Sequence, residues 1–266
     1  MNLKFSFILI LFLGCQVAMS QPTKSVTDKR TNEQYEELKS DPNVRHGAYQ
    51  QFYHNKKLQK KGFYKNNLKD STWISFGYDG EIKLIENYKD GLKEGSFKIY
   101  DYKGQILSEG NYQKDKKTGI WNYYEDAKLI HSYNHDKKEM LINNEISEKI
   151  DSIDIIYDNE RIRVIPEVNY ITLGGKKAQI HTIAMNMRYP EAALDEGTEG
   201  TVVTEIILGK DGSIKGLKTV RGIGNGLDEE SSRVVRLLAE MLIPARYKGE
   251  YVDTILNIPI RFRLSR

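Results

Sequence analysis

The residues that could do chemistry in this 266-residue chain are few and scattered. None of the five histidines stands with a cysteine or a carboxylate at a spacing typical of a metal site. No Gly-x-Ser-x-Gly nucleophile motif occurs. Gly222, Gly224 and Gly226 suggest a phosphate-binding loop, but they lack the Gly-x-Gly-x-x-Gly spacing and the parallel βαβ unit. We therefore predict no catalytic residue, no metal and no cofactor, and expect that the protein is not an enzyme.

Composition limits the remaining function classes. The length suggests one or two domains, and 39% hydrophobic with 29% charged residues suits a soluble globular protein. The net charge of +3 is mild, and lysines are interspersed with acidic residues instead of forming a basic stripe. This pattern argues against a nucleic-acid partner.

The first twenty residues are typical of an export signal. Lys4 precedes an apolar run over 5–13, and Ala18-Met19-Ser20 matches the small-x-small cleavage pattern. We expect cleavage after Ser20, giving a signal peptide over 1–20. Two alternatives stay open: lipidation of Cys15, the only cysteine, within a lipoprotein-like Leu-Gly-Cys box, or retention of the segment as an anchor. All three predict an exported protein, in the periplasm or attached to a membrane of the cell envelope.

The middle of the chain, 46–139, repeats every 24 residues, which indicates a repeat array. Each unit is predicted to be a β-hairpin that turns at a pair such as Asp79-Gly80, and neighbouring hairpins must share an aromatic core. The layout resembles MORN-type repeats. The aligned sets are Tyr49, Trp73, Phe97 and Trp121; Phe52, Phe76, Tyr100 and Tyr124; Leu58, Ile82 and Ile106; and Tyr64, Tyr88 and Tyr112.

The repeated aromatic residues allow two interpretations. Their fixed positions favour a structural role, as the columns that fill the array. The alternative is a ladder that binds peptide, glycan or lipid headgroups. For that role the better candidates lie off the columns and are expected on an exposed face: Tyr53, Tyr78, Tyr102 and Tyr123.

Two segments flank the array. Residues 21–45 are polar without strong periodicity, and we interpret them as a linker or a short irregular helix. Residues 140–173 form a connector, which alternates apolar and charged side chains over 140–165 and has a candidate extra strand at 148–157.

The C-terminal segment, 174–266, has the predicted order α-β-β-α-β with a three-stranded antiparallel sheet backed by helices. The whole chain is thus expected to be a β-rich α+β fold. The predicted elements are a helix with Ile180, Ile183, Ala184 and Met187 on its buried face, a short helix begun by Pro190 and stopped by Gly197, a hairpin of 202–208 and 214–220, a helix over 228–241 capped by Asp228, and a strand over 252–264.

Pro259 lies inside the final predicted strand. Proline cannot donate to a strand ladder, so such strands lie at a sheet edge or carry a bulge. An edge strand has unpaired N–H and C=O groups that another extended chain can satisfy. The sequence therefore predicts that the final strand lies at a sheet edge or carries a bulge.

Five motifs, taken in order, resemble the C-terminal domain of the TonB energy transducers over about 174–264. They are Tyr189-Pro190, 199–203, 210–212, 226–228 and 258–262. The resemblance implies that the short TonB box of an outer-membrane TonB-dependent transporter adds beside the final strand. Carried onto this chain, the resemblance implies a docking edge over 254–263, with Tyr189-Pro190 as a flanking contact. The partner-binding residues would be Tyr189, Pro190, Thr254, Ile255, Asn257, Pro259, Arg261 and Arg263.

Several of these residues have a purely structural alternative. Tyr189-Pro190 could form only a helix junction, and Arg261 and Arg263 could form a solvated strand face that guards against aggregation. Leu242 stands where the family carries a tryptophan. The chain also has only six prolines and no proline-rich arm, and a repeat array stands in its place.

Two functions follow. The first is a periplasmic TonB-like protein that binds an outer-membrane transporter segment by strand addition, in support of transmembrane transport. Inner-membrane proton-driven motor proteins become partners if the leader is retained, and a homodimer is a further alternative. The second function is a non-transducing envelope adaptor whose hairpin repeats bind a protein or glycan partner.

Overall fold

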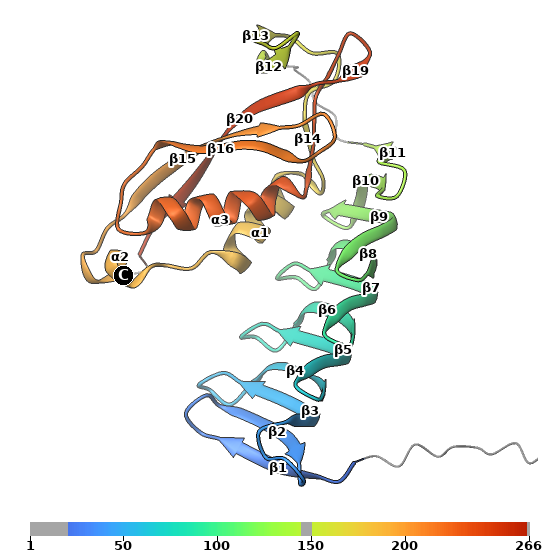
Figure 1. Ribbon diagram of the computed structural model, residues 1–266, viewed down its shortest axis with the longest axis vertical. Coiled ribbons are helices and arrows are strands. Elements are labelled where there is room, and N and C mark those ends of the chain that lie inside the picture. The colour runs from blue at the N-terminus through green and yellow to red at the C-terminus, as the bar shows by residue number, and fades with distance from the viewer. Residues whose placement is uncertain (1–20, 145–150, 265–266) are drawn as a thin grey trace, which may run out of the picture.

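A computed structural model describes residues 21–144 and 151–264, which form a tall repeat sheet and a C-terminal α/β domain (Figure 1). The predictions for the leader and Cys15 lie outside the described residues. Within the described ranges, no helix has both the length and the apolar composition that a membrane span requires.

The repeat array is one antiparallel sheet of eleven strands in chain order, so the predicted hairpin repeats are confirmed. The links predicted between hairpins are themselves tight turns, because Asn66-Asn67 and Lys114-Asp115 both adopt positive φ at two successive residues. The strands are β1 (Thr23–Asp28), β2 (Glu33–Leu38), β3 (Arg45–Phe52), β4 (Leu58–Lys65), β5 (Leu68–Phe76), β6 (Ile82–Lys89), β7 (Leu92–Tyr100), β8 (Ile106–Gln113), β9 (Lys116–Glu125), β10 (Lys128–Asn134) and β11 (Glu139–Asn143).

The linker predicted over 21–45 is wrong, because this segment forms the hairpin β1–β2 and extends the sheet beyond the repeats. Its polar side chains find partners there. Glu33 accepts hydrogen bonds from the Tyr49 hydroxyl and the Arg45 guanidinium, both at 2.8 Å. A polar strand is stable at this end of the sheet because the first repeat supplies those partners.

Two of the aromatic sets, that of Trp73 and Trp121 and that of Tyr64, Tyr88 and Tyr112, pack together on one face of the sheet, and the tryptophans recur every second repeat. Tyr124, of another set, lies on the opposite face, where its hydroxyl donates to Glu109. Trp73 and Trp121 are almost fully buried, each lying over a glycine, Gly62 or Gly110, where a Cβ atom would come within 2.2 and 2.3 Å of the indole. Glu86 stands at the equivalent position between these glycines. The rings therefore form the core of the array, as the structural interpretation predicted.

The four tyrosines off the columns differ in exposure. Tyr78 and Tyr102, at successive turn tips, are 61% and 73% exposed as expected. Tyr53 is half-buried, and its hydroxyl donates to the carbonyl of Phe76. The prediction is wrong for Tyr123, which is buried because it faces the C-terminal domain.

The C-terminal sheet has the order β13-β12-β20-β15-β16. The three predicted strands adjoin one another in it, and two strands from the connector extend it to five. Its strands are β12 (Ile153–Tyr157), β13 (Glu160–Val164), β15 (Gly200–Leu208), β16 (Ile214–Arg221) and β20 (Asp253–Phe262); short pairs are β14 (Ile171–Thr172) with β17 (Leu242–Ile243) and β18 (Arg246–Tyr247) with β19 (Glu250–Tyr251).

Three helices, α1 (Gly175–Asn186), α2 (Glu191–Asp195) and α3 (Leu227–Ala239), accompany this sheet. The buried face predicted for α1 is partly wrong, since Ile180 and Ala184 are exposed and Ala178 is buried instead. The reason is tertiary: α1 lies between α3 and the repeat sheet, so the face that packs is set by two neighbours.

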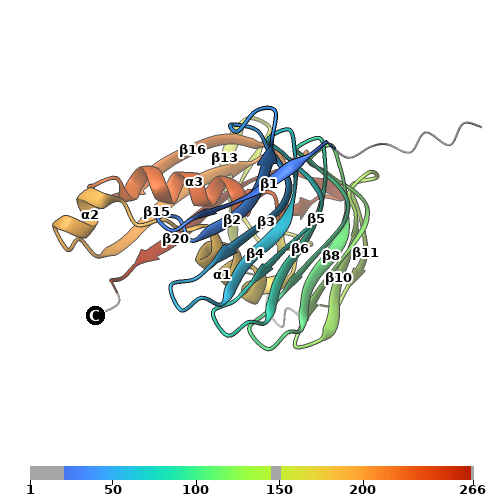
Figure 2. The same ribbon diagram turned by 90° about the horizontal axis from the view of Figure 1, so that it is seen from below.

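The two parts of the molecule share one hydrophobic core. Trp121 and Tyr123 of the repeat sheet belong to the same buried cluster as Leu173, Ala178 and the side chains of α3. Figure 2 shows the concave side of the curved sheet facing the C-terminal domain. The C-terminal domain is therefore packed on the last repeats.

Candidate functional site

Strand β20 has an open side for only part of its length. It pairs with β15 from Thr254 to Phe262, and on the other side it pairs with β12 at residues 253–255. The prediction of a free edge is thus wrong for Thr254 and Ile255, which are buried between two strands. The physical reason is that the connector supplies a strand of its own.

The remainder of β20, residues 256–262, forms what we call the open edge. Among the described residues, no strand other than β15 pairs with it. Alternate residues of an antiparallel strand direct their backbone groups to the same neighbour. Pro259 has no backbone N–H, so no hydrogen bond with β15 is lost if its backbone points to the open side. The backbone groups of Asn257 and Arg261 then point to that side as well.

The side chains along the open edge alternate strictly. Ile258, Ile260 and Phe262 are buried in the core, whereas Asn257, Pro259 and Arg261 are exposed on the outer face of the sheet.

Arg263, beyond the strand end, is exposed as well. Within the described residues, neither Arg261 nor Arg263 is paired with a carboxylate within 4.0 Å. Two free guanidinium groups thus lie at the C-terminal end of the open edge.

Tyr189 supports this end of the strand from beneath. Its ring packs edge-on against Phe262 with centroids 5.9 Å apart, and its hydroxyl donates to the carbonyl of Thr198 at 2.5 Å. Pro190 is the residue before the first turn of α2. Both positions agree with the helix-junction interpretation, and Tyr189 holds the strand end in place instead of lining the open edge.

The glycine loop at 222–226 has its donors already engaged. The N–H groups of Ile223 and Gly224 donate to the carboxylate of Asp228, at 2.9 and 3.4 Å. Gly226, and not Asp228 as predicted, is the residue that precedes α3. Because an internal carboxylate occupies the position a phosphate would take, the loop is structural.

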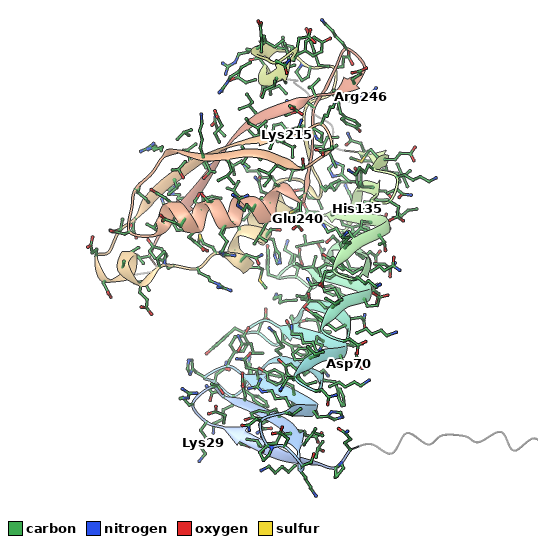
Figure 3. All side chains as sticks on the ribbon, in the orientation of Figure 1. Lys29, Asp70, His135, Lys215, Glu240 and Arg246 are labelled. Carbon is green, nitrogen blue, oxygen red and sulfur yellow. The ribbon has the colours of Figure 1, made fainter. Side chains whose placement is uncertain are left out.

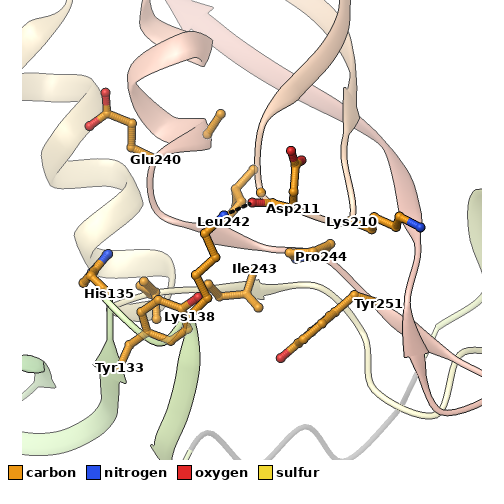
Figure 4. Close-up of a pocket in the computed structure, with 13 residues that line it drawn as sticks. Tyr133, His135, Lys138, Lys210, Asp211, Glu240, Leu242, Ile243, Pro244 and Tyr251 are labelled. Atoms are coloured by element: carbon orange, nitrogen blue, oxygen red, sulfur yellow. Dashed lines mark hydrogen bonds between the residues drawn. The ribbon is translucent and has the colours of Figure 1, made fainter. Parts of the chain in front are cut away.

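A cavity of about 310 Å³ marks the junction of the two parts (Figure 4). The Lys138 ammonium donates to the carbonyl of Asp211 across it, at 3.0 Å. Burial, with the nearby Lys117 charge, lowers the pKa of His135 to about 4. Figure 3 places His135 and Glu240 on opposite sides of this junction.

The described residues contain no group of three or more potential metal ligands. The Lys138 bond joins the two parts across the cavity, whereas the contacts of His135 are with Trp121, Tyr123 and Tyr133 of the array itself. We therefore assign the cavity to domain packing, and the open edge is the feature that can act on a partner.

The family comparison agrees with this geometry. Residues 185–264 match the model of the Gram-negative bacterial TonB protein C-terminal. The matched segment is a TonB C-terminal domain. It includes β15, β16, α3 and β20 but not β12, β13 or the repeats. Among curated proteins no match is found. The family indicates a TonB-like role in the cell envelope.

The candidate strand predicted over 148–157 is present as β12 (Ile153–Tyr157), but sequence reasoning did not predict that it covers the start of β20 or that β13 follows it. A signal was present, because Ile153, Ile155 and Ile162 alternate with charged residues over two short stretches. The intervening Asp158-Asn159 pair is typical of a tight hairpin turn, and both residues have positive φ. What the pattern could not supply is the strand beside which this hairpin would pair.

Proposed function

We propose that the TonB C-terminal domain binds an extended segment of an outer-membrane transporter by adding it as a strand along the open edge. The observation that carries the proposal is that, among the described residues, no strand pairs with one side of residues 256–262, although β20 lies in the middle of the sheet. An added strand gains main-chain hydrogen bonds along that side. The protein would do this in the periplasm, in support of transport.

The charges at the end of the open edge give the proposal a preferred ligand chemistry. Arg261 and Arg263 are exposed and unpaired within the described residues, so an acidic side chain on the incoming segment gains two charge-assisted contacts. Contacts of this exposed kind are weak and screened by salt. We expect Arg261→Ala to weaken binding about threefold at low salt and less at high salt.

The test uses the full chain and a TonB-box-like peptide that is N-methylated at one residue at a time. Each methyl group removes one backbone donor. If the peptide adds as a strand, the loss of affinity alternates along the peptide, with about tenfold loss at every second residue and little change between. A loss without alternation, or no binding by the unmethylated peptide, would contradict the proposal.

Hydrogen exchange then locates the bound strand. Strand β16 also lies at an edge of the same sheet, but it carries Lys215 and Lys218, and lysines are typical of edges protected against pairing. We expect the peptide to slow exchange in residues 256–262 and to leave 214–221 unchanged. Protection of β16 alone would show that the peptide pairs with β16 and would contradict binding at residues 256–262.

A second candidate function is the envelope adaptor, in which the repeats bind a glycan. The observation favouring it is a cavity of about 490 Å³ between the turn tips and α1, beside the exposed Tyr102 and lined by the exposed Ile180 and Met185. Under this candidate, Tyr102→Ala lowers retention of the protein on cell-wall glycan. Retention equal to wild type would leave only the docking function.

A further inference from the structure

Strand β12 already does, within this chain, what the proposed partner strand would do. It lies antiparallel to β20 and pairs Asp154 with Ile255, Ile155 with Thr254 and Ile156 with Asp253. The pairing stops there, although β20 continues for seven more residues, 256–262. The hairpin β12–β13 is thus a strand pair supplied by the chain at one end of its own open edge.

Packing holds this hairpin against the sheet. Ile155 is fully buried in a small cluster with Ala245 and Val252, which follow α3. At the hairpin turn, Tyr157 meets Tyr247 edge-on with ring centroids 5.4 Å apart. Deep burial of a β-branched side chain is typical of a permanently packed strand, not of one that detaches easily.

A row of alternating charges also holds the hairpin, on the outer face of the sheet. Asp154 of β12 binds both Arg161 and Arg163 of β13 at 2.7 Å. Arg161 continues to Glu205 of β15 at 3.1 Å, and Glu205 binds Lys218 of β16 at 2.9 Å. The hydrogen bonds from the arginines and the lysine hold the pKa values of Asp154 and Glu205 below their ordinary range.

This row reaches over β20 itself. Glu205 lies on the far side of β20 from the hairpin, directly opposite Asn257 in the β15 ladder. The Arg161 guanidinium therefore bridges the strands on either side of the docking strand, at the point where the open edge begins.

We propose that the β12–β13 hairpin is a fixed end wall that sets the register and the length of the docked segment. The inference rests on the proposed function. The wall leaves room for about seven residues of an incoming strand, roughly 23 Å at 3.3 Å per residue. The partner is then an extended segment of at most about seven residues, whose chain must leave the sheet at the wall.

The decisive experiment ties the wall to β20 with a disulfide. In a Cys15→Ser background, Ile156→Cys with Asp253→Cys joins the two paired strands. The control pair Ile153→Cys with Val164→Cys closes the hairpin on itself and leaves it free to move from β20. A TonB-box-like peptide is titrated against both variants, oxidised and reduced, and near-ultraviolet circular dichroism checks their folding.

A fixed wall predicts equal affinity, within twofold, for all four forms. If oxidation of the Ile156–Asp253 pair lowers affinity tenfold or more and reduction restores it, the hairpin must move aside for the peptide. That result would overturn the wall and leave strand addition intact. If the unmodified protein binds no peptide either, the proposed function fails and this inference fails with it.

A length series measures the wall directly. Nested peptides extended residue by residue at either end are expected to gain affinity up to about seven paired residues and then to gain no more. Continued gain at ten residues would show that the peptide pairs through residues 253–255 and displaces β12, which contradicts the wall. If the hairpin moves, both measurements contradict the wall: oxidation lowers the affinity, and peptides longer than seven residues continue to gain affinity.

Discussion

The repeat array and the TonB C-terminal domain are both antiparallel sheets, yet they use their strands in opposite ways. In the array each strand pairs with its neighbours in sequence, and the face of the sheet is filled with aromatic rings. In the domain the last strand is inserted between β15 and β12, and much of one side is unpaired. The array thus gains stability from its face, whereas in the domain, among the described residues, part of one strand's backbone has no pairing partner on one side.

The largest effect is expected where the array is most tightly packed. In Gly110→Val the new side chain would overlap the indole of Trp121, which a Cβ atom alone would approach to 2.3 Å. Expulsion of that ring should lower the free energy of unfolding by about 3–5 kcal/mol. Urea denaturation of the full chain measures this, with Gly62→Val making the same clash with Trp73.

The two glycine variants separate the array from the domain. Trp121 is part of the core shared with the C-terminal domain, whereas Trp73 is not. Gly110→Val should therefore speed hydrogen exchange in α1 as well, and Gly62→Val should not. Gly80→Ala is the control, since nothing lies within 4 Å of its Cβ position and only the positive φ costs energy, about 1 kcal/mol. Identical exchange in α1 would mean that the parts are independent.

A smaller effect is expected at the contact between the two parts. Leu173 is fully buried beside the last repeat, and Leu173→Ala should cost about 2–4 kcal/mol through the cavity it leaves. Leu141→Ala on β11 removes the same atoms from a side chain that is 44% exposed, and should cost less than about 0.5 kcal/mol. Similar losses for both would show that the contact is not close-packed.

Acid should weaken the last repeats through His135, whose ring packs against Trp121 and Tyr133. Its pKa is lowered in the folded protein to about 4 from 6.5, so the unfolded chain takes up a proton first as pH falls. The stability associated with neutral His135 is complete above pH 6.5 and is lost as pH falls towards 4. We expect the melting temperature of His135→Gln to fall less than that of wild type between pH 6.5 and 4.5. Parallel curves would contradict this assignment.

The smallest effect compares two lysines at equivalent repeat positions. Lys69 lies 4.6 Å above Trp73, and Lys117 lies 4.7 Å above Trp121. Burial lowers the pKa of Lys117 to about 8, so charging it costs folding free energy, and wild type should gain stability as pH rises from 8 towards 10.5.

At pH 7, Lys117→Met should therefore raise the melting temperature by about 2–4 °C. Lys69→Met should change it less, because the carboxylate of Glu86 favours the charged form of Lys69. Equal shifts in the two variants would mean that the C-terminal domain adds nothing to the burial of Lys117.

Particular residues show how far the sequence could be interpreted. The 24-residue spacing of the aromatic columns predicted the hairpins, and Pro259 pointed to a strand with an unpaired side. The predictions were wrong for the linker over 21–45, for the exposure of Tyr123, for part of the buried face of α1, and for the free edge at Thr254 and Ile255. Tyr123, the face of α1, Thr254 and Ile255 are placed by segments distant in the chain, and no local pattern records those neighbours. The segment 21–45 pairs with the adjacent strand β3, but its polar composition hid the hairpin.

The sequence by itself determined the elements whose interactions are local. Turn residues tolerate positive φ, alternation selects strands, and a fixed repeat brings equivalent rings together. Only the tertiary structure decided which side of β20 stays open, because the pairing of β12 with residues 253–255 is a long-range contact between two strands that could each have paired elsewhere. Backbone pairing is nearly independent of side-chain identity, so the partner of an edge is decided by what the rest of the fold brings beside it.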